Sequence, residues 1–425
     1  MHIIRNGLWG RLVFTVLMLT VFKHAHSLEL TIKDAEQVAV QNDPLILQFQ
    51  AMSMASMEDA VAEARWPDPK LKIGTVNVPI TSFDFKAEPM TQIVIGLQQA
   101  IPPGGMLKEK QEKKQLQAEI HRAQSMSRAL LVLKNLRNAW MEVYFYNQAR
   151  ALVQESSEVF DQLVKITQYQ YRAGRGQQQD VMRAQLERSL LQDKETQIEQ
   201  QKEFHMAELE KWIGTSTRDH SLSLMFPELP TLPPIEELSE NINVHPSVAI
   251  RSAKLGVARK SVAIVRQTYK PTWMFDVSYG MRQGENMVNG QAEARADFLS
   301  AMVSVNLPFF TSKQQDKRLN ARGQEVNAAS DAIEAQKRDL RRLLDASFTN
   351  WTNLGQRLEF YKSTVLPQAA QYAEASRKAY QSHVSDFSEL VRARLRQLES
   401  NLSALRIRVD RAKSHYDLRY IAGEL

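Results

Sequence analysis

The feature that most constrains this chain is an internal duplication. Its second half repeats the plan of the first half at an offset of about 202 to 211 residues. Each copy has a helical segment, two segments of alternating polarity separated by a polar loop, and a long helical stretch that turns back on itself. The recurring landmarks are Asn42-Asp43-Pro44 and Val244-His245-Pro246, Arg65-Trp66-Pro67 and Tyr269-Lys270-Pro271, Ala100-Ile101-Pro102 and Asn306-Leu307-Pro308, Ala139-Trp140 and Asn350-Trp351, and Trp212-Ile213-Gly214 and Tyr420-Ile421-Ala422-Gly423. This order of landmarks predicts two similar helix–strand–strand–helix units.

The predicted helices are much longer than those of ordinary globular proteins. From Met106 to Tyr171 there is neither proline nor glycine, and at about 1.5 Å per residue such a helix extends roughly 100 Å. In the last helical segment the apolar positions step by three and four residues, which is the period of left-handed coiled coils. These positions are Leu395, Leu398, Leu402, Leu405, Val409, Ala412 and Tyr416. The sequence therefore predicts long coiled-coil hairpins, which a soluble helical bundle would also contain.

Four segments of alternating polarity indicate transmembrane β-strands, at about 70–78, 91–99, 272–282 and 298–307. In the third segment, the apolar residues of one face are Trp273, Phe275, Val277 and Tyr279. Four strands cannot close a barrel, because the smallest outer-membrane barrels have about eight strands. An open edge in lipid would leave backbone groups unpaired. Three copies of the chain would supply twelve strands and two copies eight, and a ring wide enough to be a passage favours three.

The first residues have the pattern of a secretion signal. Arg5 and Arg11 precede or border an apolar run of 11 residues at 12–22, and Ala25-His26-Ser27 offers small residues for cleavage. The run is too short to span a bilayer as a helix, which needs about 20 residues. The expected organisation is a signal peptide at 1–27, a first repeat at 28–226 with its hairpin tip at about 171–179, a Pro-rich linker at 227–240, and a second repeat at 241–425 with its tip at about 380–388.

Composition removes several classes of function. The chain has no cysteine, which excludes disulfides, thiolate metal sites and cysteine nucleophiles. Its net charge of +6 falls to about +3 without the signal region, so no nucleic-acid partner is expected. No phosphate loop, nucleophile elbow or metal-ligand spacing is present, so we expect no enzyme activity, no cofactor and no metal site. The thioethers of Met52, Met54 and Met57 could bind soft cations such as copper or silver, but their helical spacing is more typical of core residues.

The ends of the long helices resemble those of a known family. The first of these ends is Tyr171-Arg172-Ala173-Gly174, and nine residues after its tyrosine comes Asp180-Val181-Met182-Arg183-Ala184. The second is Tyr380-Gln381-Ser382-His383, and nine residues after its tyrosine comes Glu389-Leu390-Val391-Arg392-Ala393. With the duplicated plan over residues 30–425, they resemble the TolC-type outer-membrane efflux proteins. The resemblance implies a mainly α fold with a β-barrel portion: a homotrimer with a 12-stranded barrel in outer-membrane lipid and an α-helical periplasmic tunnel. It places the protein in the outer membrane of a Gram-negative bacterium. It also implies a periplasmic adaptor (membrane fusion) protein and, indirectly, an inner-membrane pump of the resistance-nodulation-division (RND) type as partners.

The resemblance also implies functional residues at the two hairpin tips. The expected adaptor contacts are Tyr171, Arg172, Ala173, Gly174, Arg175, Gly176, Tyr380, Ser382, His383 and Val384. Because Ser382-His383 replaces the usual Ala-Gly pair, and glycine adopts positive φ most cheaply, the second turn is expected to be looser. The aperture candidates are Asp180 and Glu389, with Arg183 and Arg392 three residues further on as possible ion-pair partners. The alternative is that these carboxylates only favour the dipole of their own helix.

The expected function is an exit duct that passively conducts substrate expelled by an inner-membrane pump. The junction Gln99-Ala100-Ile101-Pro102-Pro103-Gly104-Gly105-Met106-Leu107-Lys108 is similar to that of the branch serving heavy-metal RND pumps, which favours metal cations as cargo. Multidrug efflux and type I protein secretion are the alternatives within the duct class. A soluble periplasmic coiled-coil adaptor is the alternative from another class, although it would carry one hairpin rather than two.

Overall fold

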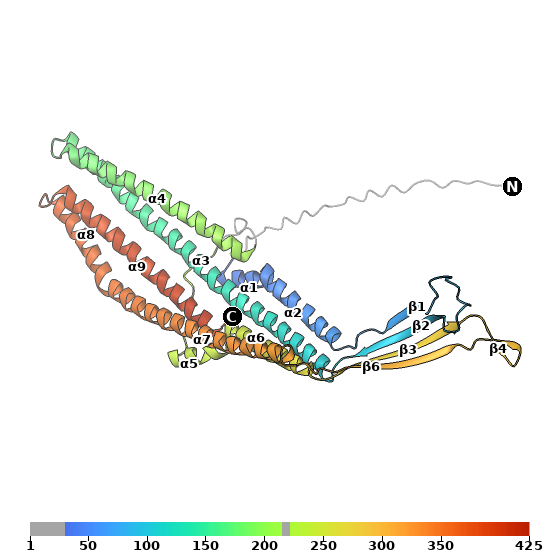
Figure 1. The fold of residues 1–425 in the computed structure, drawn as a ribbon. Helices are drawn as coiled ribbons and strands as arrows, with labels where there is room; N and C mark the ends of the chain where they lie inside the picture. The colour runs from blue at the N-terminus through green and yellow to red at the C-terminus, as the bar shows by residue number, and fades with distance from the viewer. Residues whose placement is uncertain (1–29, 215–221, 425) are drawn as a thin grey trace, which may run out of the picture.

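The computed structural model describes residues 30–214 and 222–424, and the signal peptide predicted at 1–27 lies outside these residues. The first repeat contains α1 (Ile32–Asn42), α2 (Pro44–Glu63), β1 (Lys70–Val76), β2 (Gln92–Ile101), α3 (Met106–Arg172) and α4 (Gln178–Ile213). The second contains α5 (Ile235–Asn241), the 3-10 turn η2 (Ile242–Val244), α6 (Pro246–Gln267), β3 (Thr272–Arg282), β4 (Glu285–Val288), β5 (Gln291–Ala294), β6 (Phe298–Asn306), α7 (Gln315–Phe360), the π-helical turn η3 (Tyr361–Val365), α8 (Leu366–Gln381) and α9 (Phe387–Ala422). The strands lie at one end of an elongated molecule and the two hairpin turns at the other (Figure 1). The predicted fold class, mainly helical and duplicated with a strand portion, is confirmed.

The helices of the two repeats match in length. α4 and α9 each contain 36 residues, and the 67-residue α3 corresponds to the uninterrupted succession of α7, η3 and α8. The π-helical turn η3 lies just before Pro367 in α8. Proline has no N–H and its ring crowds the carbonyl four residues earlier, so a wider turn lets the helix continue past it. The helical arm of the second repeat curves in this region, as Figure 1 shows.

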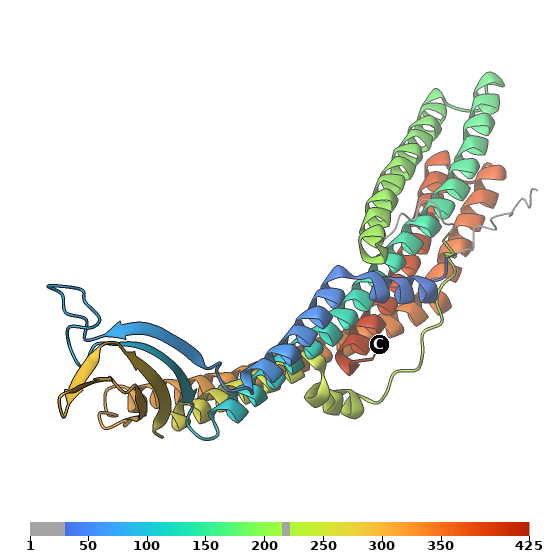
Figure 2. The same cartoon turned by 90° about the vertical axis from the view of Figure 1, so that its right-hand side faces the viewer.

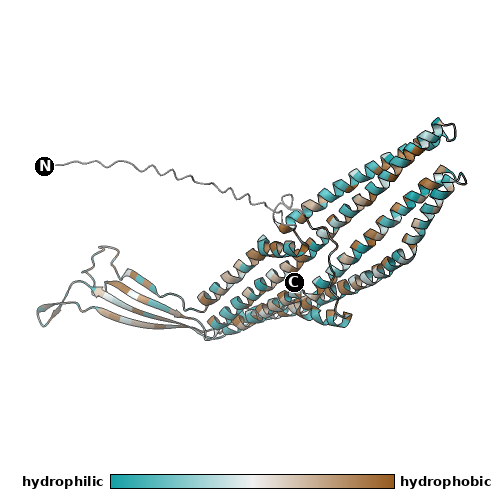
Figure 3. Cartoon of the chain, turned by 180° about the vertical axis from the view of Figure 1, so that it is seen from behind, coloured by the Kyte–Doolittle hydropathy of each residue, from teal (hydrophilic) through white to brown (hydrophobic). Residues whose placement is uncertain are grey.

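The four long strands form one antiparallel sheet in the order β1-β2-β3-β6, with Ile95 opposite Tyr279. One face is apolar and exposed, with Leu71, Ile73, Ile95, Leu97, Phe275, Val277, Tyr279, Leu299 and Val303. The opposite face carries polar side chains, among them the ion pair of Lys72 with Asp276. Figure 3 shows this mixture of hydrophobic and hydrophilic residues along the strands. β1 and β6 each pair on one side only, so both outer edges of the sheet are open within the chain.

A short hairpin, β4–β5, replaces the polar loop that was expected between the strands of the second repeat. Its turn contains Asn289 and Gly290, both with positive φ (51° and 86°), as a type I′ turn requires. The Asn-Gly pair was therefore a readable hairpin signal in the sequence. Arg295 ties this hairpin to the β1–β2 loop by donating hydrogen bonds of 3.1 Å to the carbonyl oxygens of Lys86 and Glu88.

The centre of the molecule is held by helices from both ends of the first repeat. Trp140 of α3 is fully buried in a cluster with residues of α1, α2 and α4. Asp43 separates α1 from α2 and caps the latter, because its side chain accepts the backbone N–H groups of Leu45 and Ile46. Arg128 of α3 donates to the same carboxylate at 2.9 Å. One aspartate thus starts a helix and fixes it to its neighbour.

The second repeat packs as its seven-residue period predicts, since none of the seven heptad positions in α9 is exposed. The linker predicted at 227–240 needs a correction. It is extended only as far as Pro234, because Ile235–Asn241 forms α5, whose Leu238 is fully buried. Figure 2 shows this extended segment leading into α5. Within residues 30–214 and 222–424, no helix is both long and apolar enough to cross a membrane.

Candidate functional site

The two hairpin turns lie close to one another at the end of the molecule opposite the sheet (Figure 1). The first turn joins α3 to α4. Two backbone hydrogen bonds close it. The N–H of Gly174 donates to the carbonyl oxygen of Tyr171 at 3.0 Å, and the N–H of Arg175 donates to the carbonyl oxygen of Gln170 at 2.9 Å. Gly174 has a φ of 68°, which glycine adopts without strain. This is the expected tight turn.

The second turn joins α8 to α9 and has the same hydrogen bonds. The N–H of His383 donates to the backbone carbonyl oxygen of Tyr380 at 3.1 Å, and the N–H of Val384 donates to the backbone carbonyl oxygen of Ala379 at 2.9 Å. His383 takes the left-handed backbone of Gly174, with a φ of 61°. The expectation of a looser second turn is therefore not met. The hydroxyl of Ser382 donates to the carbonyl oxygen of Lys378 at 3.0 Å, which helps to close the helix end.

The predicted tip residues form two neighbouring exposed surfaces. The side chains of Tyr171 and Val384 are 47% and 81% exposed, whereas Tyr380 is half-buried between the two hairpins. The hydroxyl of Tyr380 donates a hydrogen bond to the side-chain oxygen of Gln170 on α3. Burial, and then the negative charge of Asp180, raise the pKa of Tyr380. Tyr380 is therefore a contact between the repeats as well as a tip residue.

The aperture candidates lie in the first turns of α4 and α9, but only one has the expected partner. Glu389 pairs with Arg392, and it also accepts a hydrogen bond from the hydroxyl of Tyr372. This hydrogen bond, with burial, raises the pKa of Tyr372. Arg183 does not pair with Asp180. It donates instead to the hydroxyl of Ser388 on α9 at 2.7 Å, which is a second link between the hairpins.

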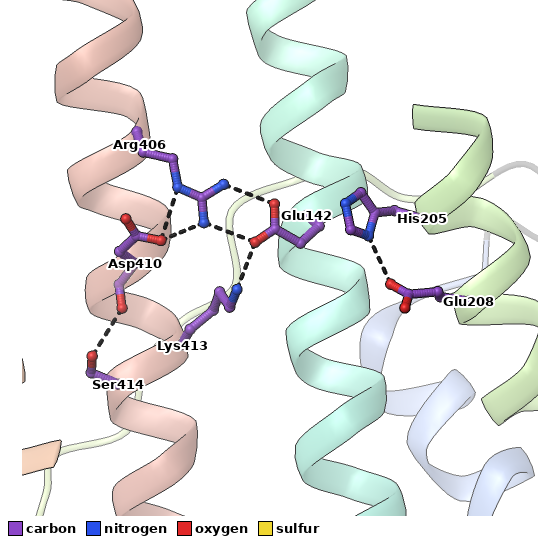
Figure 4. A network of polar contacts seen from close by, with 7 residues as sticks. All are labelled: Glu142, His205, Glu208, Arg406, Asp410, Lys413 and Ser414. Carbon is purple, nitrogen blue, oxygen red and sulfur yellow. Dashed lines mark hydrogen bonds and ion pairs between the residues drawn. The ribbon is translucent and has the colours of Figure 1, made fainter. Parts of the chain in front are cut away.

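A buried ion network joins the repeats nearer the middle of the long helices (Figure 4). Glu142 of α3 is 8% exposed and accepts hydrogen bonds from Arg406 at 2.8 Å and from Lys413 at 2.6 Å, both on α9. Burial alone would raise the pKa of Glu142, but these two cations outweigh it and lower the pKa to about 2. Asp410 shares Arg406. Because Glu142 and Arg406 are 264 residues apart, no local signal in the sequence predicted this network.

On the other flank of α3, a ring nitrogen of His205 in α4 lies within hydrogen-bond distance, 2.8 Å, of a carboxylate oxygen of Glu208 (Figure 4). The ring of His205 also stacks on Tyr146. No group of three or more histidine and acidic residues in the described parts of the chain could hold a metal ion. Met54 is 69% exposed on α2, and Met52 and Met57 are exposed as well. These methionines are therefore not core residues of the single chain, contrary to the interpretation of their spacing.

Comparison with known proteins gives one family match and several similar folds. Residues 238–424 match the family model described as "Outer membrane efflux protein". The outer membrane protein VceC of Vibrio cholerae has a similar structure, with a TM-score of 0.76 and 13% identity over 92% of this chain and 96% of that one. The CmeC outer membrane channel of Campylobacter jejuni gives a TM-score of 0.77 and 11% identity over 92% and 85%. CusC gives a TM-score of 0.78 and 12% identity over 94% and 93%. No curated protein sequence matches.

Proposed function

We propose, from the premise that the chain belongs to the outer membrane efflux protein family through residues 238–424, that it is one protomer of an outer-membrane exit duct. The fold supports extending this premise to the first repeat, because 92% of the chain aligns with the structures of an outer membrane protein and of an outer membrane channel. Such a duct conducts passively and needs no catalytic group. Its location is the outer membrane, with the helices reaching into the periplasm.

The sheet carries this proposal, because it has one exposed apolar face and two open edges. Lipid favours side chains such as Phe275 and Val277 on the outer face. The open edges, however, would leave unpaired backbone groups in lipid, each costing several kcal/mol. Pairing β6 of one protomer with β1 of the next removes both edges. Three protomers then close a barrel of twelve strands, with Lys72 and Asp276 on its inner face.

The hairpins would continue the passage into the periplasm and end in the two tips. Tyr171 and Val384 are exposed there and offer a surface to the hairpins of a periplasmic adaptor. The adaptor would couple the duct to an inner-membrane RND-type pump. The two repeats present tips of the same backbone geometry, so one protomer offers two similar adaptor sites.

Heavy-metal cations are the cargo that we favour. The strand-to-helix junction at 99–108 supports this choice, and so do the carboxylates of Asp180 and Glu389 beside the tips, which would attract cations if three copies surround one opening. Antibiotics and secreted proteins are the alternative cargoes, because a passive duct takes its specificity mainly from its pump and adaptor.

Extraction and electrophoresis test the duct itself. The protein should require detergent to leave the membrane fraction, migrate as a trimer that boiling dissociates, and form discrete conductance steps in planar bilayers. Release from the periplasm without detergent, as a monomer, would instead identify the soluble adaptor-like alternative.

The cargo is tested separately, in a strain that lacks the gene. Loss of the duct should sensitise the strain to one or more of copper, silver, zinc, cobalt and nickel, and a plasmid copy should restore growth. Sensitivity to antibiotics alone would overturn the choice of metal cations while leaving the duct intact.

A further inference from the structure

A cavity of about 450 Å³ lies beneath the extended segment that connects the two repeats. Residues 229–233 of this segment cover it, and Phe348, Trp351, Arg411 and His415 from α7 and α9 line its walls. The hairpin tips, the sheet and the Glu142 network contribute nothing to it. Its volume lies in the range of small-molecule sites, about 300–1,000 Å³.

Arg411 is an unpaired cation in this cavity. Its guanidinium lies over the ring of Trp351 at 5.1 Å, and its Nε is buried without a hydrogen-bond partner. None of the residues that line the cavity is acidic, and no ion pair of Arg411 exists within the described residues. Gly355 of α7 leaves room for the guanidinium, since a Cβ there would lie 3.2 Å from Nε. By contrast Arg406, little more than one helical turn away, has two carboxylate partners.

His415, in the wall of the same cavity, carries a second unsatisfied polar atom. The side chain is 1% exposed, and its Nε2 lies 2.7 Å from the carbonyl oxygen of Pro230, a group that can only accept. Nε2 therefore carries the hydrogen, and Nδ1 of the neutral ring is an acceptor. Nδ1 is buried and has no partner. Buried polar atoms are paired in most proteins, so two unpaired nitrogens within one wall distinguish this cavity from an ordinary apolar gap.

We propose that this cavity binds a small organic anion with a planar, apolar body. Its carboxylate would accept from the terminal N–H groups of Arg411, the part of the guanidinium that protein does not enclose, and would pair with this cation. Its body would pack against Trp351, Phe348 and the prolines of the covering segment. The charge of the wall selects anions over cations, and the aromatic rings select flat molecules over inorganic ions.

Titration of the full-length protein in detergent with benzoate tests the proposal, with benzamide as the neutral analogue. Benzoate should bind saturably, one molecule per chain, and benzamide should bind at least about tenfold more weakly because it lacks the charge. Arg411→Gln should weaken benzoate binding by a similar factor, and Arg411→Lys should restore part of it. The matched control is Arg408→Gln, because Arg408 lies on the same helix but stacks on Phe226 outside the cavity.

Circular dichroism melting of each variant would separate loss of the site from loss of the fold. Trp351→Leu, which keeps the charge and removes the stacking surface, should also weaken benzoate binding. Three results would overturn the proposal: equal affinities for benzoate and benzamide, an unchanged affinity in folded Arg411→Gln, or no saturable benzoate binding at millimolar concentrations. The last result would mean that water alone fills the cavity.

Discussion

Glu142 joins the two repeats with a single carboxylate. Its partners Arg406 and Lys413 come from the other repeat, and all three side chains are largely withdrawn from solvent. Breaking such a pair by removing one partner leaves an uncompensated charge, which is more costly than the net stability of the pair itself. The network therefore specifies how α3 and α9 align more than it adds to the free energy of unfolding.

The variant Glu142→Gln should lower the free energy of unfolding by about 3–5 kcal/mol, because Lys413 loses its carboxylate and Arg406 keeps only Asp410. Chemical denaturation of the purified protein measures this. The control is Glu399→Gln, which removes an exposed pair with Arg396 on α9 and should cost less than about 1 kcal/mol. Equal losses in the two variants would contradict the role of the buried network.

Two buried histidines predict a dependence of stability on pH. His245 caps α6 and contacts Tyr420, and His415 contacts Pro230; each is 1% exposed, and burial lowers the pKa of both below the usual 6.5. A group with a depressed pKa in the folded state stabilises it above the unfolded pKa. That stability is lost as the pH falls below 6.5 through the folded pKa.

The melting temperature should therefore fall between pH 7.5 and pH 5.5. In the double variant His245→Gln/His415→Gln it should be lower at pH 7.5 but should change less over the same interval. A scanning calorimeter provides the measurement. An equally steep fall in the double variant would assign the pH dependence to other groups.

At the scale of elements, the two hairpins show that equivalent positions can hold one geometry with different residues. Gly174 and His383 share the same left-handed backbone and the same closing hydrogen bonds. A residue with a Cβ takes this conformation at a cost of roughly 1 kcal/mol. The backbone hydrogen bonds of His383 and Val384 close this turn although the residue at its left-handed position is not glycine.

The exchange of these two residues tests that interpretation. His383→Gly should stabilise the second turn by about 1 kcal/mol, and Gly174→His should destabilise the first by a similar amount. Amide hydrogen exchange at Val384 and Arg175, whose N–H groups close the turns, reports each local change. Slower exchange at Arg175 in Gly174→His would contradict the strain argument.

The elements that could be predicted from sequence are those with a local cause. The absence of proline and glycine between Met106 and Tyr171 predicted α3, and alternating polarity predicted the four long strands. Asn289-Gly290 is an equally local signal, in this case for the β4–β5 hairpin. The link from Arg183 to Ser388 could not be predicted, because it joins residues 205 positions apart and depends on how two hairpins pack.

For the whole molecule, the duplicated plan explains why one chain cannot form a closed duct. Each repeat supplies two long strands and one long hairpin, and the chain as a whole still has two open sheet edges. Neither a closed barrel nor a closed tunnel is possible within one copy. Any property of an aperture formed by Asp180 and Glu389 therefore belongs to the proposed trimer rather than to the chain.

Single-channel recording tests this aperture. The variant Asp180→Asn/Glu389→Gln should lower the cation-to-anion permeability ratio by roughly twofold or more. The reason is that the double substitution removes six carboxylates of the trimer from around one narrow opening. Glu203→Gln, an exposed change further along α4, should leave the ratio unchanged. If trimers of the double variant still conduct ions with the original cation-to-anion permeability ratio, the proposed ring is ruled out.

The two unpaired edges, β1 and β6, also have a genetic consequence. In a closed ring, each protomer must accept one neighbour through β1 and offer β6 to another. A protomer altered only in β6 still joins a normal protomer through β1, and then blocks the next addition. Alleles with a defect in one edge strand should therefore be dominant over the normal gene, whereas alleles that prevent folding altogether should be recessive.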